Sequence, residues 1–156
     1  MATDHINITV GQIMTSPAIT VGPDATLIEA AKIMVSHRIG CLPVVNDELQ
    51  VLGIITERSF FPSEKKLPFT NQNMAWILGE WIGNLTDLEK TVAEVRKLRV
   101  ADAEVQRHTV KQETPLAEVA DQLLHEAVHH LVVENDGKVI GVVSRRDLIK
   151  IFAGSA

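Results

Sequence analysis

An internal repeat constrains the fold of this chain more than any other feature. Starting from Thr20 and Thr109, "TVGPDATLIEAAKIM" faces "TVKQETPLAEVADQLL", and further on "GIITERS" at 53–59 faces "GVVSRRD" at 141–147. A segment that recurs at this length predicts two copies of one supersecondary unit. A single small sheet with one apolar face is only marginally stable. We therefore expect the two copies to pack face to face with approximate twofold symmetry, which creates two related clefts between them.

Each copy has the same order of patterns. A short extended start precedes a segment with apolar residues at i, i+3, i+4 and i+7, the spacing of one helix face. Two short apolar runs then flank a turn rich in Asn, Asp and Gly, as in a hairpin, and a further helix follows. The pattern predicts a β-α-β-β-α unit in each copy and an α+β fold. The helix faces consist of Leu27, Ala30, Ala31 and Met34 in the first copy, and Leu116, Val119, Ala120, Leu123 and Leu124 in the second.

The repeat divides the chain into three parts. Residues 8–61 form the first copy, residues 98–153 form the second, and 62–97 have no partner in the repeat. The middle part carries a Thr-x-x-Glu capping box, which starts helices, so we expect an inserted and mostly helical segment. It also holds Trp76 and Trp81, which either cover a core or form a surface for a partner.

Composition excludes several classes of protein. The chain of 156 residues is 46% hydrophobic and 22% charged, so it can bury a core. Its net charge of −5 disfavours a nucleic-acid-binding protein, which needs a basic face. The single Cys41 permits no disulfide within the chain. No signal peptide is visible, and no apolar run approaches the roughly 20 residues of a membrane span. We therefore expect a cytoplasmic protein that neither crosses a membrane nor binds nucleic acid.

The second heptad has the chemistry of a ribose and phosphate site. Ser144 ends a strand, and Asp147 lies in the first turn of the next helix. A carboxylate there can accept hydrogen bonds from both hydroxyls of a ribose, while Ser144, the free amides of the helix start and Arg145 or Arg146 can bind a phosphate. The same residues are also typical of a helix cap with no ligand, and the heptad alone does not decide between the two interpretations.

Taken in order and twice, these pieces resemble a pair of CBS domains, the tandem arrangement called a Bateman module. The resemblance rests on "VGQIMTSPAITVGPDATLIEAAKIM", "HRIGCLPVV", "HHLVV" and the two heptads. It implies a regulatory module, not an enzyme, that binds an adenosyl ligand between its repeats and controls a partner protein that the sequence does not identify. AMP is the favoured ligand, with ADP, ATP, S-adenosylmethionine and NAD as alternatives, and no cofactor is required. The resemblance also implies a homodimer, formed through the helices around Leu27 and Leu116. The alternative function is an interaction module without any ligand.

The resemblance implies that both copies line each cleft. The expected main site consists of Ile19, Ile39, Gly40, His129, Val143, Ser144, Arg146 and Asp147. The expected second site consists of Thr56, Ser59, His108 and Val128. Ser59 stands where the second copy has Asp147, and a hydroxyl makes weaker contacts than a carboxylate. We therefore predict asymmetric binding, with one good site and one weak or empty site.

"HEAVH" at 125–129 matches the His-Glu-x-x-His signature of zinc proteases. That signature needs one continuous helix, so that both histidines share a face. The repeat instead places His129 where the chain turns into a strand, and no third ligand is evident at a suitable spacing. We therefore expect no metal site, and we expect His129 and His130 to face the cleft.

Overall fold

The computed structural model describes residues 7–60, 85–103, 105–125 and 128–154. Trp76, Trp81 and most of the predicted insert lie outside the described residues. The part before the insert contains α1 (Val10–Ile13), α2 (Leu27–His37), β1 (Cys41–Val45), β2 (Val51–Thr56) and the 3₁₀ turn η1 (Glu57–Phe60). The insert contributes α4 (Leu85–Arg96). The second copy contains η2 (Val100–Asp102), β3 (Thr109–Lys111), α5 (Leu116–His125), β4 (His130–Asn135), β5 (Lys138–Ser144) and α6 (Arg145–Phe152).

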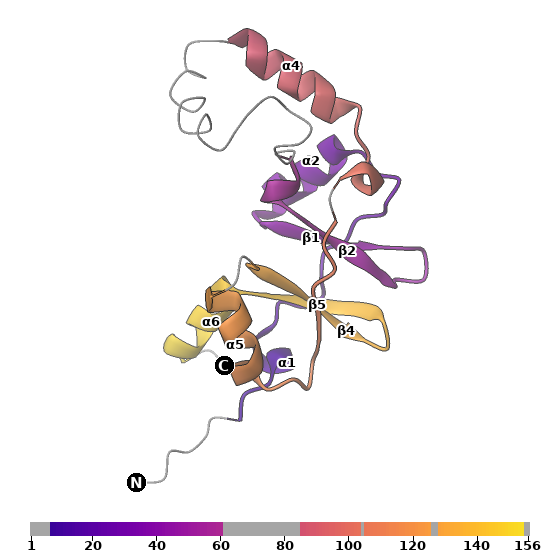
Figure 1. Ribbon diagram of the computed structural model, residues 1–156. Coiled ribbons are helices and arrows are strands. Elements are labelled where there is room, and N and C mark those ends of the chain that lie inside the picture. The colour runs from indigo at the N-terminus through magenta and orange to yellow at the C-terminus, as the bar shows by residue number, and fades with distance from the viewer. Residues whose placement is uncertain (1–6, 61–84, 104, 126–127, 155–156) are drawn as a thin grey trace.

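Both copies follow one plan, which confirms the predicted α+β fold of two repeats (Figure 1). In the second copy, β3 runs parallel to β4, and β5 pairs antiparallel with β4. In the first copy, β1 and β2 form the same antiparallel hairpin, but the start of the unit is reduced to one parallel bridge between Val21 and Val44. The first copy is thus an abbreviated version of the second.

The copies also differ after the heptad. The second continues into the eight-residue helix α6, whereas the described part of the first ends with the four-residue turn η1, since residues 61–84 lie outside the described residues. Pro62 follows two residues after η1 ends. The residue before a proline is disfavoured in helical conformation, and proline itself cannot donate to a helix. Pro62 disfavours a regular continuation of η1, and the predicted final helix of the first copy otherwise lies outside the described residues.

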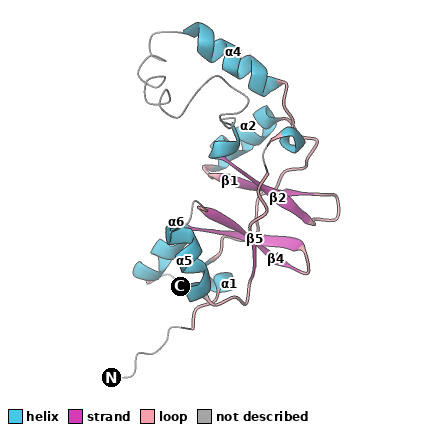
Figure 2. Cartoon of the chain, in the orientation of Figure 1, coloured by secondary structure: helices cyan, strands magenta, loops and turns pink. Residues whose placement is uncertain are grey.

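The layers run helix, sheet, sheet, helix (Figure 2). The two hairpins face each other through a buried cluster of Cys41, Val51, Ile54 and Val132. A bridge between Gln50 and Lys138 joins their ends. On the outside, α2 covers one sheet and α5 with α6 covers the other, so that each sheet is apolar on both faces.

The apolar helix faces point into the protein. Leu27 in α2 is 1% exposed and Leu116 in α5 is 7% exposed. The apolar faces that carry these two residues are therefore covered within the chain, and the homodimer through the helices around them stays a prediction. The large apolar side chains that do remain exposed on helices include Val35, Leu124, Ile149 and Phe152.

Each copy completes its core with residues from the start of the other. Val10 and Ile13, at the beginning of the first copy, are buried in the second copy's core beside Leu123 and Leu148. Val100, at the beginning of the second copy, is fully buried in the first copy's core. Backbone hydrogen bonds fix the exchange, for example Gly11 N to Gln112 O at 2.8 Å and Val100 N to Ala25 O at 2.8 Å.

The heptad glycines permit the crossings that this exchange requires. The chain at Met14 and Thr15 passes so close to Gly141 that a Cβ there would lie 2.8 Å from Thr15 O. Thr15 exchanges two backbone hydrogen bonds with Val142, of 2.8 and 3.0 Å. Gly53 is crossed in the same way by residues 105–106, and Ile54 N donates to Gln106 O at 2.9 Å. Glycine is required at both positions, because no side chain fits beneath the chain that crosses there. We call Met14 and Thr15, which cross Gly141, the crossing segment of the first copy.

Candidate functional site

A cavity of about 370 Å³ lies between the two copies. This volume falls within the range of small-molecule sites, roughly 300–1,000 Å³. Residues before β1 form one wall, and β4, β5 and α6 form the other. The lining includes Thr15, Ile19, His37, Arg38, Ile39 and Gly40 from the first copy, and His130, Val142, Ser144, Arg146, Asp147 and Lys150 from the second.

Most residues of the expected main site meet at this cavity. Ile19, Ile39, Gly40, Ser144, Arg146 and Asp147 all line it. Val143 does not, because it is fully buried in the second copy's core, and its neighbour Val142 faces the cavity. His129 is exposed, and His130 takes its place in the wall. Successive strand residues point to opposite faces, so an alignment that is correct in register can still assign the wrong one of two neighbours.

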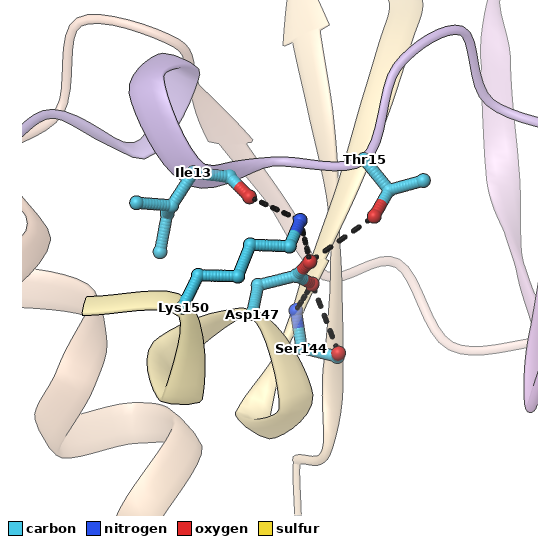
Figure 3. A network of polar contacts seen from close by, with 5 residues as sticks. All are labelled: Ile13, Thr15, Ser144, Asp147 and Lys150. Carbon is cyan, nitrogen blue, oxygen red and sulfur yellow. Dashed lines mark hydrogen bonds and ion pairs between the residues drawn. The ribbon is translucent and has the colours of Figure 1, made fainter. Parts of the chain in front are cut away.

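Asp147, which lines the cavity, is the centre of a polar network (Figure 3). Its Oδ2 accepts hydrogen bonds from Ser144 N at 2.8 Å and Ser144 Oγ at 2.9 Å. Its Oδ1 accepts one from Thr15 Oγ1 at 3.1 Å and pairs with Lys150 Nζ at 2.6 Å. Lys150 Nζ also donates to Ile13 O at 2.9 Å. The carboxylate therefore joins α6 to the crossing segment of the first copy.

The same carboxylate serves both interpretations of the heptad. Asp147 is 5% exposed and caps α6 through Ser144, as the helix-cap interpretation requires. It also lines the cavity, as the ligand interpretation requires. The cap uses Oδ2 alone, whereas Oδ1 faces the crossing segment, where Thr15 and Lys150 now occupy it.

Ser59 has the capping role of Asp147 in the first copy. Its Oγ accepts a hydrogen bond from Thr56 N at 3.1 Å, as Asp147 Oδ2 does from Ser144 N. The other residues of the expected second site are engaged elsewhere: the ring of His108 lies 3.0 Å from Gln106 Oε1, and Val128 packs against the second copy's core. None of the four residues lines either cavity described here.

Two arginines stand at the border between this cavity and a neighbouring one of about 570 Å³. Arg38 and Arg146 line both, together with Ile39 and Gly40. Arg38 caps the end of α2 in the left-handed conformation, with φ of 54°, which turns the chain toward β1. Within the described ranges neither guanidinium group has a hydrogen-bond or ion-pair partner. Both are therefore free to bind an anion.

Burial changes the acid–base behaviour of two residues in the cavity wall. It raises the pKa of the Cys41 thiol to about 12, and the negative charges of Asp147 and Glu57 add to this effect. The thiol thus stays protonated at neutral pH and is a poor nucleophile. Burial also lowers the pKa of His130, as does the nearby His129, while Glu57 and Asp147 oppose the shift. The Nδ1 of His130 is buried and has no hydrogen-bond partner among the described residues.

The lowered pKa of His130 predicts a loss of stability in acid. The unfolded chain takes up this proton near pH 6.5, whereas the folded chain does so only at lower pH. The free energy of unfolding should therefore fall as pH drops below about 6.5, by less than about 1.4 kcal/mol per pH unit, the limit for one whole proton. Urea unfolding between pH 7.5 and 5 should show a shallower fall for His130→Asn. If the free energy of unfolding falls equally with pH in the wild type and in His130→Asn, the acid-induced loss of stability does not come from His130.

The His-Glu-x-x-His match does not form one helix. Helix α5 ends at His125, and His129 lies outside any helix, next to the start of β4. In the part of the chain that the structure describes, no three His, Cys, Asp or Glu side chains cluster as metal ligands. A search of the same part for membrane-spanning helices finds none of sufficient length and hydrophobicity.

Known proteins resemble this chain along most of its length. The CBS domain model matches residues 10–62 and 100–154. An uncharacterised 17.7 kDa protein of Acidianus ambivalens is 29% identical over 142 residues, which cover 90% of this chain and 71% of that protein. The L-aspartate semialdehyde sulfurtransferase of Methanocaldococcus jannaschii is 25% identical over 93% of this chain, but the chain spans only 23% of that enzyme.

Solved structures have the same fold. The CBS domain of a CBS-domain-containing membrane protein from Sphaerobacter thermophilus is 34% identical, with a TM-score of 0.69 over 92% of this chain and 87% of that one. CBSX2 of Arabidopsis thaliana, in complex with AMP, is 21% identical with a TM-score of 0.69, over 94% and 97%. The CBS domain pair of protein MJ0100, in complex with 5′-methylthioadenosine and S-adenosyl-L-methionine, is 24% identical with a TM-score of 0.64, over 95% and 98%.

Proposed function

The chain belongs to the CBS domain family and carries two copies of the domain, and from this premise we propose that it is a sensor that binds an adenine nucleotide between them. AMP is the favoured ligand. The bound nucleotide would regulate a partner protein, and the module would act as a homodimer in the cytoplasm. No reaction is assigned to the chain, because its buried thiol and capped carboxylate suit binding better than catalysis.

One observation carries the proposal: a buried carboxylate lines a cavity to which both copies contribute. Asp147 is the one charged residue among the described part of the chain that is buried, and it lies beside Ser144 at the start of α6. Buried charges are costly unless they are paired or functional. A ligand that contacts this carboxylate touches both copies at once, so its binding can change how they pack together.

The remaining walls suit the other parts of a nucleotide. Ile19, Ile39 and Val142 offer an apolar surface for a purine. The free guanidinium groups of Arg38 and Arg146 can bind a phosphate through charge-assisted hydrogen bonds. The unpartnered Nδ1 of His130 offers a hydrogen bond to a ligand atom. Two structural relatives, CBSX2 with AMP and MJ0100 with S-adenosyl-L-methionine, support an adenosyl ligand.

The asymmetry between the two heptads supports a single strong site. Ser59 offers one hydroxyl, which already caps the turn after β2. A ribose there would gain no charge-assisted hydrogen bond, which is about twice as strong as a neutral one. We therefore expect one nucleotide per chain with measurable affinity, bound near Asp147.

Calorimetric titration with AMP, ADP, ATP, S-adenosylmethionine and NAD tests the proposal. We expect about one binding site per chain, and a loss of at least about ten-fold in affinity for Asp147→Asn, which corresponds to about 1.4 kcal/mol. Asparagine preserves the size of the side chain and can still accept a bond from Ser144 N. Ser59→Ala is the matched control and should bind like the wild type. Two equal sites, or unchanged binding by Asp147→Asn, would contradict the proposal.

A second candidate function is an interaction module without ligand. The exposed side chains of Leu124, Ile149 and Phe152 favour it, since Phe152 is 90% exposed and Ile149 is 62% exposed. Large apolar side chains that gather on a surface often mark a contact with another protein. If no adenosyl compound binds in the titration and light scattering shows a stable dimer, this candidate replaces the first.

A further inference from the structure

The carboxylate of Asp147 has no free hydrogen-bonding position in this structure. A carboxylate offers about four lone-pair sites, two on each oxygen. Ser144 fills both sites of Oδ2, through its N and its Oγ. Thr15 Oγ1 and Lys150 Nζ fill both sites of Oδ1. A ribose can therefore reach this carboxylate only if one of the present donors leaves.

Lys150 is the donor that can leave. The two bonds from Ser144 belong to the cap of α6, and breaking them would free the start of the helix. Thr15 is fixed by backbone hydrogen bonds to Val142 in both directions. The side chain of Lys150 is long and 39% exposed, whereas that of Asp147 is 7% exposed. Turning toward the cavity would cost Lys150 its hydrogen bond to Ile13 O, but it would break no hydrogen bond between two backbone groups.

We propose that Lys150 determines ligand specificity by occupying the ribose position on Asp147 until a phosphate draws it away. The inference rests on the proposed function and adds to it the class of ligand. A neutral nucleoside must break the pair between Lys150 and Asp147 and offers the ammonium group nothing in return. A 5′-phosphate offers a new anion to the same ammonium group, so the exchange of partners costs little.

The charges around the cavity also favour a ligand that carries a phosphate. Besides Lys150, its lining carries the unpaired guanidinium groups of Arg38 and Arg146, and Asp147 is its one carboxylate within the described residues. A phosphorylated adenosyl compound would meet opposite charge here. A sulfonium compound such as S-adenosylmethionine would meet like charge once Lys150 had moved. The site should thus prefer AMP to both adenosine and S-adenosylmethionine.

Titrations with AMP and with adenosine, on the full chain, test the role of Lys150. Lys150→Met removes the competitor, so adenosine should bind at least about five-fold more tightly than to the wild type. AMP affinity should change little, because the substitution removes both the competitor for the ribose position and one cation near the phosphate. The ratio of the two affinities should therefore fall by about five-fold or more. Lys138→Met removes an exposed lysine at the start of β5, outside both cavities, and should leave the ratio unchanged.

The outcomes separate this inference from the proposed function. If the wild type binds neither AMP nor any other adenosyl compound, the proposed function fails. If the wild type binds AMP but Lys150→Met leaves adenosine affinity unchanged or lower, only the role of Lys150 is refuted. Lys150→Gln guards against a folding defect, because its neutral amide can still donate to Ile13 O, and it should change the ratio in the same direction. Thermal unfolding of each variant confirms that it is folded.

Discussion

Asp147→Ala is expected to lower the free energy of unfolding by about 3 kcal/mol, even without a ligand. The substitution removes the cap of α6, which contributes about 1 kcal/mol. It also leaves Ser144, Thr15 and Lys150 without the acceptor that they now share. Each buried donor without a partner costs about 1–3 kcal/mol, less where water can reach it. Lys150 is half-exposed and contributes little to this loss.

Ser59→Ala is the matched control in the other copy. It removes a neutral hydrogen bond to Thr56 N of 3.1 Å, and such a bond contributes about 1 kcal/mol. Urea unfolding of both variants, with the wild type alongside, measures the difference directly. If the two substitutions cost the same, the network around Asp147 contributes nothing beyond its cap.

Gly141→Ala is expected to cost about 2 kcal/mol of stability and to weaken ligand binding as well. A Cβ at this position would lie 2.8 Å from Thr15 O and 2.8 Å from Met14 Sδ. A backbone oxygen cannot turn aside, so the crossing segment must move away, and overpacking of this kind costs about 1–3 kcal/mol. The hydrogen bond from Thr15 Oγ1 to Asp147 would then break. Because Asp147 belongs to the proposed ligand site, a shift of the crossing segment also affects ligand binding.

Gly22→Ala is the control for this substitution, because nothing lies within 4 Å of a Cβ built there. Its stability should stay within about 0.5 kcal/mol of the wild type, as is usual at unconstrained surface positions. Urea unfolding and AMP titration of the two variants compare them. If Gly141→Ala and Gly22→Ala have the same free energy of unfolding, the crossing segment can move away from the added Cβ at no cost in stability.

The sequence predicts the repeated architecture because repetition and periodicity are local signals. Leu27, Ala30 and Met34 follow helical spacing and are buried on one face of α2. The two heptads align, and each ends a strand and begins a turn or helix. The final helix of the first copy stays a prediction, since residues 61–84, which follow Phe60, lie outside the described part of the chain.

The site was less accessible to such reasoning, since it depends on contacts between distant residues. Asp147 and Ser144 stand out because the heptad recurs, but Thr15 lies 132 residues before its partner Asp147. No local sequence pattern predicts the contact between these two residues. Lys150 is different: it follows Asp147 by three residues on a helix, a spacing at which opposite charges pair. His130 was predicted to face the cleft and lines the cavity, where it pairs with Ser144 in the register of β4 and β5.

The exchange of core residues has a consequence for how the protein is made. The first copy's core needs Val100, so it stays incomplete until the ribosome has passed the insert. Val10 and Ile13 are synthesised among the first residues, yet their burial partners Leu131, Val143 and Leu148 come near the end of the chain. Domains generally fold as units during synthesis, and here the first copy's core contains no residue beyond Val105, whereas the second copy's core needs both ends of the chain. The first copy can therefore complete its core before the second copy has emerged, while Val10 and Ile13 must wait for nearly the whole chain.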